Sequence, residues 1–189
     1  MAENKLLRPA VFLDRDGTIS EEVGYLNHLS RFRMLGCAPG AIRRLKDGGF
    51  PVFVATNQSG VARGYFPESL VAQVHAEMNR QLEDAGVKLD GIYCCLHRSE
   101  DGCDCRKPKT GLLERAAREH GIDLARSVVV GDRYLDMELA RRVGAQAVLV
   151  RTGFGRGELQ WHSADWPAAP DYVAEDLGEA AEWILRNRR

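Results

Sequence analysis

The stretch Ala10-Val11-Phe12-Leu13-Asp14-Arg15-Asp16-Gly17-Thr18 joins a short apolar run to two aspartates that stand two positions apart. The run 10–13 predicts a first strand, and such apolar runs suit a parallel sheet that is covered on both faces. Polar residues begin directly where this strand ends. Because ligands of open α/β sheets bind beyond the carboxyl ends of the strands, Asp14 and Asp16 are candidates for a functional site.

The rest of the chain alternates short apolar runs with helical segments. We expect further strands over 51–55, 92–95, 127–130 and 147–150, helices over 39–47, 67–85, 112–120 and 135–143, and a closing strand from 174 followed by a helix over 179–188. Within 67–85, an apolar residue recurs at every fourth position, which predicts a core-facing stripe of Leu70, Val74, Met78 and Leu82. This alternation indicates an α/β fold with a doubly wound, mainly parallel sheet.

The bulk properties are those of an ordinary soluble enzyme. A length of 189 residues suits one domain, 1–189, and hydrophobic and charged residues make up 44% and 28% of the chain. A formal net charge of −1 gives no general attraction to nucleic acid or to an acidic membrane, so we expect neither partner. The segment 1–5 lacks the apolar run of a signal peptide, and we expect a cytoplasmic monomer.

A second pair of aspartates, Asp132 and Asp136, follows the predicted strand 127–130. The two pairs would meet if the first and fourth strands were neighbours in the sheet. Two carboxylates ~4 Å apart repel each other by about 4 kcal/mol at an effective dielectric constant near 20, so a cation should join them. Mg²⁺ prefers such oxygen ligands. A single aspartate is more often a cap or turn residue, but two pairs placed after strands favour a metal site.

Candidate phosphate-binding residues lie between the two acidic pairs. The run Thr56-Asn57-Gln58-Ser59 follows the second predicted strand and offers hydroxyl, amide and backbone donors. Lys107 can neutralise a phosphoryl oxygen as a point charge. Taken alone, the first run can cap a helix and Lys107 can be a surface residue. Together they form an anion site opposite the carboxylates.

These motifs resemble, in order and in placement after strands, the four motifs of the haloacid-dehalogenase superfamily of phosphatases. They comprise 12–18, Thr56, Lys107 and 131–136, and they span most of the chain. The resemblance implies a Mg²⁺-dependent phosphatase that works through an aspartyl-phosphate intermediate. It implies that Asp14 is the nucleophile, that Asp16 is the general acid and base, and that Thr56 and Lys107 stabilise the transferring oxygens. It also implies that the metal is held by Asp14, Asp132 and the backbone carbonyl of Asp16. Asp136 would either bind the metal through water or orient Lys107.

A loop over 95–105 carries a second set of metal-binding residues. Cys95-Leu96-His97 and Cys103-Asp104-Cys105 offer four ligands, and such pairs can close a tetrahedral zinc site of three cysteines and one histidine. With four protein ligands, this zinc would be structural. Cys94, which is adjacent to Cys95, is the alternative ligand. Because side chains alternate along a strand, only one of the two faces the loop, and we choose Cys95, which provides the Cys-x-His pair.

The cysteine loop ends directly before Arg106 and Lys107, so we expect it to hold these two cations over the phosphate site. The remaining histidines, His28, His75, His120 and His162, stand without partners at ligand spacing, and we expect them on the surface.

The cysteine loop and the Arg-Lys-Pro run that follows it resemble a capless subgroup that contains heptose-bisphosphate and histidinol-phosphate phosphatases. Within it, 21–25 and 56–64 look more like the heptose branch, which implies removal of the C7 phosphate of a heptose 1,7-bisphosphate. Histidinol phosphate or another small phosphomonoester is the alternative, favoured by Lys109 in the run 109–111. A non-enzymatic phosphosugar-binding module is a third hypothesis. The implied substrate contacts are Glu22, Val23, Gly24, Tyr25, Asn57, Gln58, Ser59, Arg106 and Arg133.

Overall fold

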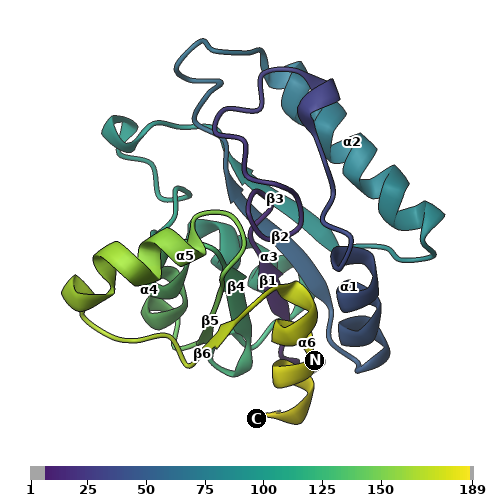
Figure 1. Cartoon of the computed structure of the whole chain (residues 1–189), viewed down its shortest axis with the longest axis vertical. Coiled ribbons are helices and arrows are strands. Elements are labelled where there is room, and N and C mark those ends of the chain that lie inside the picture. Colours follow the sequence, from purple (N-terminus) through teal and green to yellow (C-terminus); the bar gives the residue numbers. More distant parts are fainter. Residues whose placement is uncertain (1–6, 188–189) are drawn as a thin grey trace, which may run out of the picture.

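A computed structural model describes residues 7–187 and shows one six-stranded sheet (Figure 1). The strand order is β3-β2-β1-β4-β5-β6, and all neighbouring strands pair in parallel. The strands are β1 (Val11–Leu13), β2 (Val52–Asn57), β3 (Gly91–Cys95), β4 (Val128–Gly131), β5 (Gln146–Val150) and β6 (Tyr172–Ala174). The predicted doubly wound fold is confirmed, and among the described strands the sheet is wholly rather than mainly parallel.

Helices cover both faces of this sheet (Figure 1). One face carries α1 (Ala38–Asp47), α2 (Glu68–Asp84) and α6 (Leu177–Arg186), and the other carries α3 (Gly111–His120) and α4 (Tyr134–Arg142). Successive side chains of a strand point to opposite faces of the sheet and pack into different cores. Val11 and Leu13 pack against the first group of helices, and Phe12 packs against the second. The predicted stripe of α2, which consists of Leu70, Val74, Met78 and Leu82, is buried, as expected.

Three parts of the chain differ from the sequence-based expectation. β2 continues to Asn57, so Thr56 and Asn57 end this strand instead of following it. The last helix begins and ends earlier than predicted, and residue 188, where it was expected to end, lies outside the described residues, as do residues 1–5. Between β5 and β6, no element was expected because the segment lacks periodicity. It contains the short helix α5 (Gly155–Gly157), the π-helical turn η4 (Glu158–His162) and the 3₁₀ turn η5 (Ser163–Asp165).

The strand order places the acidic motifs at one edge of the sheet. β1 lies between β2 and β4, so the expectation that the first and fourth strands are neighbours is confirmed. The backbone N–H of Asp14 donates to the carbonyl of Val130 at 2.9 Å, which continues the β1–β4 pairing into the site. The connection from β1 to α1 contains only the 3₁₀ turn η1 (Leu29–Arg31), and the connection from β2 to α2 contains no helix or strand. The site is therefore covered by loops.

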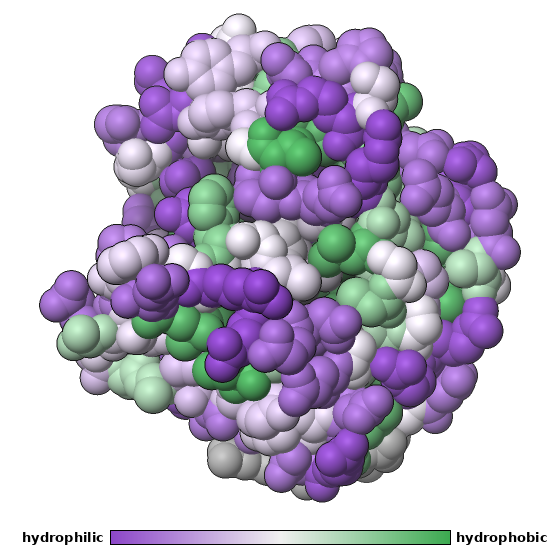
Figure 2. All heavy atoms as spheres, viewed as in Figure 1, coloured by the Kyte–Doolittle hydropathy of each residue, from purple (hydrophilic) through white to green (hydrophobic). Residues whose placement is uncertain are grey.

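Figure 2 shows a face that is mostly hydrophilic, with apolar side chains in small, separate patches. The larger apolar side chains gather instead in the two cores on either side of the sheet. Within residues 7–187, no helix combines the length and the apolar character that a membrane crossing would require.

Candidate active site

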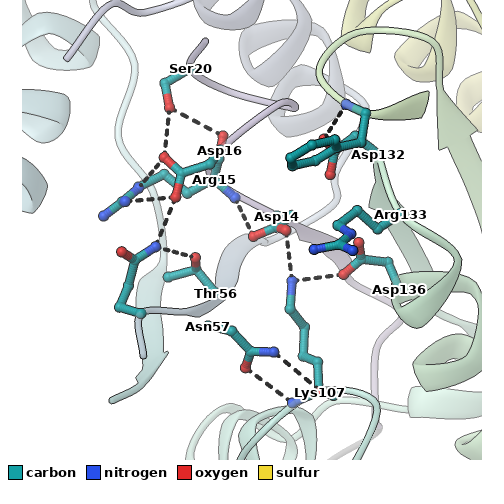
Figure 3. Close-up of polar contacts among 12 residues, drawn as sticks. Asp14, Arg15, Asp16, Ser20, Thr56, Asn57, Lys107, Asp132, Arg133 and Asp136 are labelled. Atoms are coloured by element: carbon teal, nitrogen blue, oxygen red, sulfur yellow. Dashed lines mark hydrogen bonds and ion pairs between the residues drawn. The ribbon is translucent and has the colours of Figure 1, made fainter. Parts of the chain in front are cut away.

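Lys107 lies between two carboxylates at the centre of the site (Figure 3). Its Nζ is 2.9 Å from Oδ2 of Asp14 and 2.7 Å from Oδ1 of Asp136. Burial alone would lower the pKa of Lys107, but the attraction of Asp136 and Asp14 outweighs it, and the pKa is raised. Lys107 is therefore a fixed positive charge beside Asp14.

Three carboxylates gather around this lysine. One oxygen each of Asp14, Asp132 and Asp136 lies within 4.8 Å of the others. Burial, followed by repulsion from Asp14 and Asp136, raises the pKa of Asp132 to about 8, and burial raises the pKa of Asp136 in spite of Lys107. Among the described residues, the buried Oδ2 of Asp136 has no hydrogen-bond partner. An orphaned oxygen within a set of crowded, desolvated carboxylates fits the oxygen ligands that Mg²⁺ requires.

Two glycines allow the backbone to approach Asp132 closely. A Cβ on Gly17 would lie 2.0 Å from Oδ2 of Asp132, and a Cβ on Gly153 would lie 2.1 Å from the same atom. Both glycines have positive φ, 76° and 56°, which other residues adopt only with strain. The same Oδ2 accepts a hydrogen bond from the backbone N–H of Phe154 at 2.8 Å. Sequence reasoning missed Gly153 and Phe154 because no motif marks this segment.

The carboxylate of Asp16 points away from the three-aspartate cluster and toward Arg15 (Figure 3). Arg15 donates from Nε to Oδ1 at 3.0 Å and from Nη2 to Oδ2 at 2.7 Å. Gln58 Nε2 donates to Oδ2 at 2.8 Å, and the hydroxyl of Ser20 donates to Oδ1 at 3.3 Å. The side chain of Asp16 is thus outside the cluster, which leaves its backbone carbonyl as the metal ligand that the family resemblance implies.

The end of β2 and the residue that follows it, Gln58, support the two catalytic candidates Thr56 and Lys107. Thr56 is buried, and its hydroxyl accepts a hydrogen bond from Gln58 Nε2 at 3.0 Å. Asn57 uses both ends of its side-chain amide on the backbone of Lys107: Nδ2 donates to the carbonyl at 3.2 Å, and Oδ1 accepts from the N–H at 3.1 Å. Asn57 therefore holds the segment that carries Lys107 against the end of β2.

A pocket of about 290 Å³ opens over these groups and is lined by Asp14, Asp16, Thr56, Lys107 and Asp132. The predicted substrate contacts that line it are Glu22, Gly24, Tyr25, Asn57, Gln58, Ser59, Arg106 and Arg133. Val23 is not among the lining residues: its side chain packs against the core, and its carbonyl accepts a hydrogen bond from Arg31. Gly60, Leu135 and Phe154 line the pocket without having been predicted.

Tyr25 stands at the mouth of the pocket and is held from two sides. Its ring meets the ring of Tyr65 edge-on, with centroids 4.6 Å apart and an interplanar angle of 76°. Arg31 donates from Nη1 to the carbonyl of Tyr25 at 3.0 Å and from Nη2 to the carbonyl of Val23 at 2.9 Å. The loop that carries Tyr25 is therefore held in shape by its own hydrogen bonds and by this ring contact.

Two arginines bring positive charge to the pocket wall. Arg106 donates from Nη1 to the carbonyl of His97 at 3.1 Å, which ties it to the cysteine loop. The guanidinium of Arg133 lies over the ring of Phe154, 4.9 Å from its centroid. Both guanidinium groups are thus anchored while they face the same cavity.

The cysteine loop forms a compact cluster of four potential ligands. Cys95, His97, Cys103 and Cys105 each place one ligand atom within 4.8 Å of the others. The Sγ of Cys95 is 3.2 Å from that of Cys105 and 3.7 Å from that of Cys103, well beyond a disulfide bond of about 2.05 Å. Cys94 packs into the opposite core. The structure thus gathers the four residues chosen from the sequence in an arrangement that suits a tetrahedral zinc ion.

Comparisons with known proteins agree with this fold. A family model described as "HAD-hyrolase-like" matches residues 104–180. The crystal structure of D,D-heptose 1.7-bisphosphate phosphatase from B. bronchiseptica, complexed with magnesium and phosphate, is similar with a TM-score of 0.86 and 36% identity, covering 94% of this chain and 98% of that one. The fold and the site thus define a phosphatase of the haloacid-dehalogenase class.

Two curated relatives narrow the class to one family. D-glycero-D-manno-heptose-1,7-bisphosphate 7-phosphatase of Thermosynechococcus vestitus is 44% identical over 94% of this chain and 95% of its own length. D-glycero-beta-D-manno-heptose-1,7-bisphosphate 7-phosphatase of Haemophilus influenzae is 42% identical over 97% of this chain and 100% of its own length. The chain belongs to the family of heptose-1,7-bisphosphate 7-phosphatases.

Proposed function

We propose that this chain removes the C7 phosphate of D-glycero-D-manno-heptose 1,7-bisphosphate, with Asp14 as the nucleophile. The observation that carries the proposal is the position of Asp14, which lines the pocket with Lys107 at 2.9 Å and two further carboxylates beside it. The names of the relatives supply the substrate.

Two steps account for the reaction. In the first, an oxygen of Asp14 bonds to phosphorus while the bond between phosphorus and the C7 oxygen breaks. Asp16, which enters this step protonated, gives its proton to the departing alkoxide. In the second, water bonds to phosphorus, the bond to Asp14 breaks, and Asp16 takes the proton from the water. Inorganic phosphate and a free C7 hydroxyl result, and both aspartates return to their starting states.

The surrounding groups stabilise the negative charge of the transferring phosphoryl group. Lys107 supplies a fixed positive charge, and the hydroxyl of Thr56 supplies a donor. When bound, Mg²⁺ neutralises phosphoryl oxygens as a Lewis acid. The residues that would hold it are Asp14, Asp132, Asp136 through water, and the backbone carbonyl of Asp16. The B. bronchiseptica structure, which is complexed with magnesium and phosphate, supports magnesium as the metal.

The second phosphate and the sugar would contact residues at the outer wall of the pocket. Arg106 and Arg133 offer planar guanidinium groups that suit phosphate oxygens. Gly24 and Tyr25 lie on the loop that covers the opening and would contact the sugar. The cavity of about 290 Å³ matches a small phosphorylated metabolite rather than a macromolecule.

A structural zinc ion on Cys95, His97, Cys103 and Cys105 completes the proposal. The four ligand atoms already lie together, and three thiols with one imidazole are a preferred zinc set. The carbonyl of His97 accepts the hydrogen bond from Arg106, so an ordered loop also orients this arginine at the pocket.

Release of phosphate from heptose 1,7-bisphosphate and from histidinol phosphate, measured side by side with Mg²⁺, tests the substrate. We expect the heptose to be turned over faster, and faster turnover of histidinol phosphate would overturn the substrate. Asp14→Asn should abolish both activities, whereas Asp47→Asn, an exposed control on α1, should keep them. Substantial turnover by Asp14→Asn would overturn the nucleophile.

A further inference from the structure

Arg15 is a buried cation to which the proposed mechanism gives no part. It is only 1% exposed and is the largest of the fully buried side chains in the described chain. A buried charge is costly unless it is paired and hydrogen-bonded. Arg15 meets this requirement mainly through Asp16, to which it donates two hydrogen bonds at 3.0 and 2.7 Å.

The third contact of Arg15 comes from α2. Its Nη1 lies 3.3 Å from Nε2 of His75. An arginine only donates, so Nε2 must be the acceptor, and the ring is neutral with its proton on Nδ1. Burial and the neighbouring Arg15 lower the pKa of His75 to about 4, which agrees with a neutral ring. The expectation of a surface role for this histidine is wrong, because its side chain is partly buried against Arg15.

We propose that Arg15 and His75 are positioning residues for Asp16: His75 fixes the guanidinium, and the guanidinium fixes the carboxylate at the wall of the pocket. The proposal rests on the function given to Asp16 above. The bidentate contact sets the plane of the carboxylate, and Gln58 and Ser20 complete its hydrogen bonds. His75 acts on Asp16 only through Arg15, because His75 is not among the residues that line the pocket.

Proton transfer is sensitive to this placement. A general acid must lie within about 2.6–3.2 Å of the oxygen that it protonates. A displacement of about 1 Å can cost roughly a hundredfold in rate. The sugar alkoxide is a poor leaving group that needs the proton, whereas p-nitrophenolate leaves without one. Misplacement of Asp16 should therefore slow the sugar phosphate and spare the aryl phosphate.

The experiment measures kcat/KM for heptose 1,7-bisphosphate and for p-nitrophenyl phosphate with Mg²⁺. This constant covers the steps up to departure of the leaving group, so hydrolysis of the shared aspartyl-phosphate does not enter. The ratio of the two constants is independent of the fraction of active protein. Partial unfolding of a variant therefore does not change this ratio.

His75→Leu removes the acceptor for Arg15. We expect kcat/KM to fall by about tenfold or more for the sugar phosphate and by less than about twofold for p-nitrophenyl phosphate. His75→Gln keeps an acceptor and should restore most of the ratio of kcat/KM for the sugar phosphate to kcat/KM for p-nitrophenyl phosphate. His162→Leu, at an exposed histidine of η4, should leave both constants unchanged. Equal losses on both substrates, no loss in His75→Leu, or no recovery in His75→Gln would overturn the proposal.

A parallel variant, Asp16→Asn, separates this inference from the function on which it rests. If Asp16 is the acid, this variant should show the same selective loss in a stronger form. Equal losses on both substrates in Asp16→Asn would refute the acid assignment and the positioning role with it. A selective loss in Asp16→Asn combined with an unchanged ratio in His75→Leu would refute only the positioning role.

Discussion

Lys107 and Asp136 form an ion pair of 2.7 Å in which both side chains are 1% exposed. The same ammonium reaches the carboxylate of Asp14, so one buried cation balances part of a three-carboxylate cluster. Removal of one partner from a buried pair leaves an uncompensated charge, which costs far more than the loss of a surface contact.

Lys107→Met should therefore lower the free energy of unfolding by about 3–5 kcal/mol in metal-free protein near pH 8. It should also lower kcat by roughly 10²–10³, because a fixed charge beside the phosphoryl group is lost. Lys46→Met is the matched control: its pair with Asp90 is 2.6 Å long, but the side chains are 30% and 28% exposed. Urea unfolding and phosphate release measure both effects. Equal destabilisation by the two variants would contradict the prediction.

Mg²⁺ affinity should rise with pH up to about 8. The pKa of Asp132 is raised to about 8, so below this pH its carboxyl retains a proton that the metal must displace. Affinity should increase by up to about tenfold per pH unit between pH 6 and 8 and then level off. Calorimetric titration at pH 6.5 and 8.5, in buffers of different ionisation enthalpy, should show protons released at the lower pH. An Mg²⁺ affinity that is the same at pH 6.5 and 8.5 would contradict the displacement of a proton from Asp132.

The stability of the metal-free protein should fall with rising pH, whereas the Mg²⁺ affinity should rise. The pKa of Asp132 is about 8 in the folded protein, above the ordinary value of 3.8 that it has in an unfolded chain, so the folded state holds more protons between these two pH values. Stability therefore falls as pH rises through this window, because the folded state must ionise a buried carboxyl. Asp132→Asn should weaken that fall, which thermal unfolding at pH 5 and pH 8 can measure. A fall of the same size in Asp132→Asn would refute the assignment to this residue.

Elemental analysis should find about one zinc per chain, since four ligands close a tetrahedral site. Cys105→Ser should lose the zinc, lower the melting temperature and raise KM, because the loop that orients Arg106 through His97 loosens. Cys37→Ser, at a cysteine outside the cluster, should retain the metal. Equal zinc contents in the two variants would exclude the proposed ligand set.

Tyr65→Ala should weaken substrate binding although Tyr65 is not among the residues that line the pocket. The edge-on contact with Tyr25, with centroids 4.6 Å apart, holds a ring over the opening. Aromatic pairs contribute about 0.5–1.5 kcal/mol, so KM for the heptose should rise about two- to twelvefold with little change in kcat. Tyr65→Phe keeps the ring and should behave as the parent protein. An unchanged KM in Tyr65→Ala would show that the contact is dispensable.

The sequence was sufficient for the fold class and for the order of the motifs. Both depend on local patterns: apolar runs that mark strands, an apolar stripe such as that of α2, and polar residues placed directly after strands. The same local spacing marked the four residues of the cysteine loop, which the structure brings together. A monomeric state, a cytoplasmic location and the absence of nucleic-acid and membrane partners stay predictions.

Only the tertiary structure decided how the side chains around Asp14 are partnered. The contact between Arg15 and His75 joins residues 60 positions apart, and that between Asp132 and Phe154 joins residues 22 apart. Such contacts depend on the packing of a helix or a loop against the sheet, which leaves no periodic trace in the chain. Sequence alone thus determined that Asp14 directly follows the first strand of a phosphatase fold. Packing decided that Asp16 turns to Arg15 while Lys107 turns to Asp14.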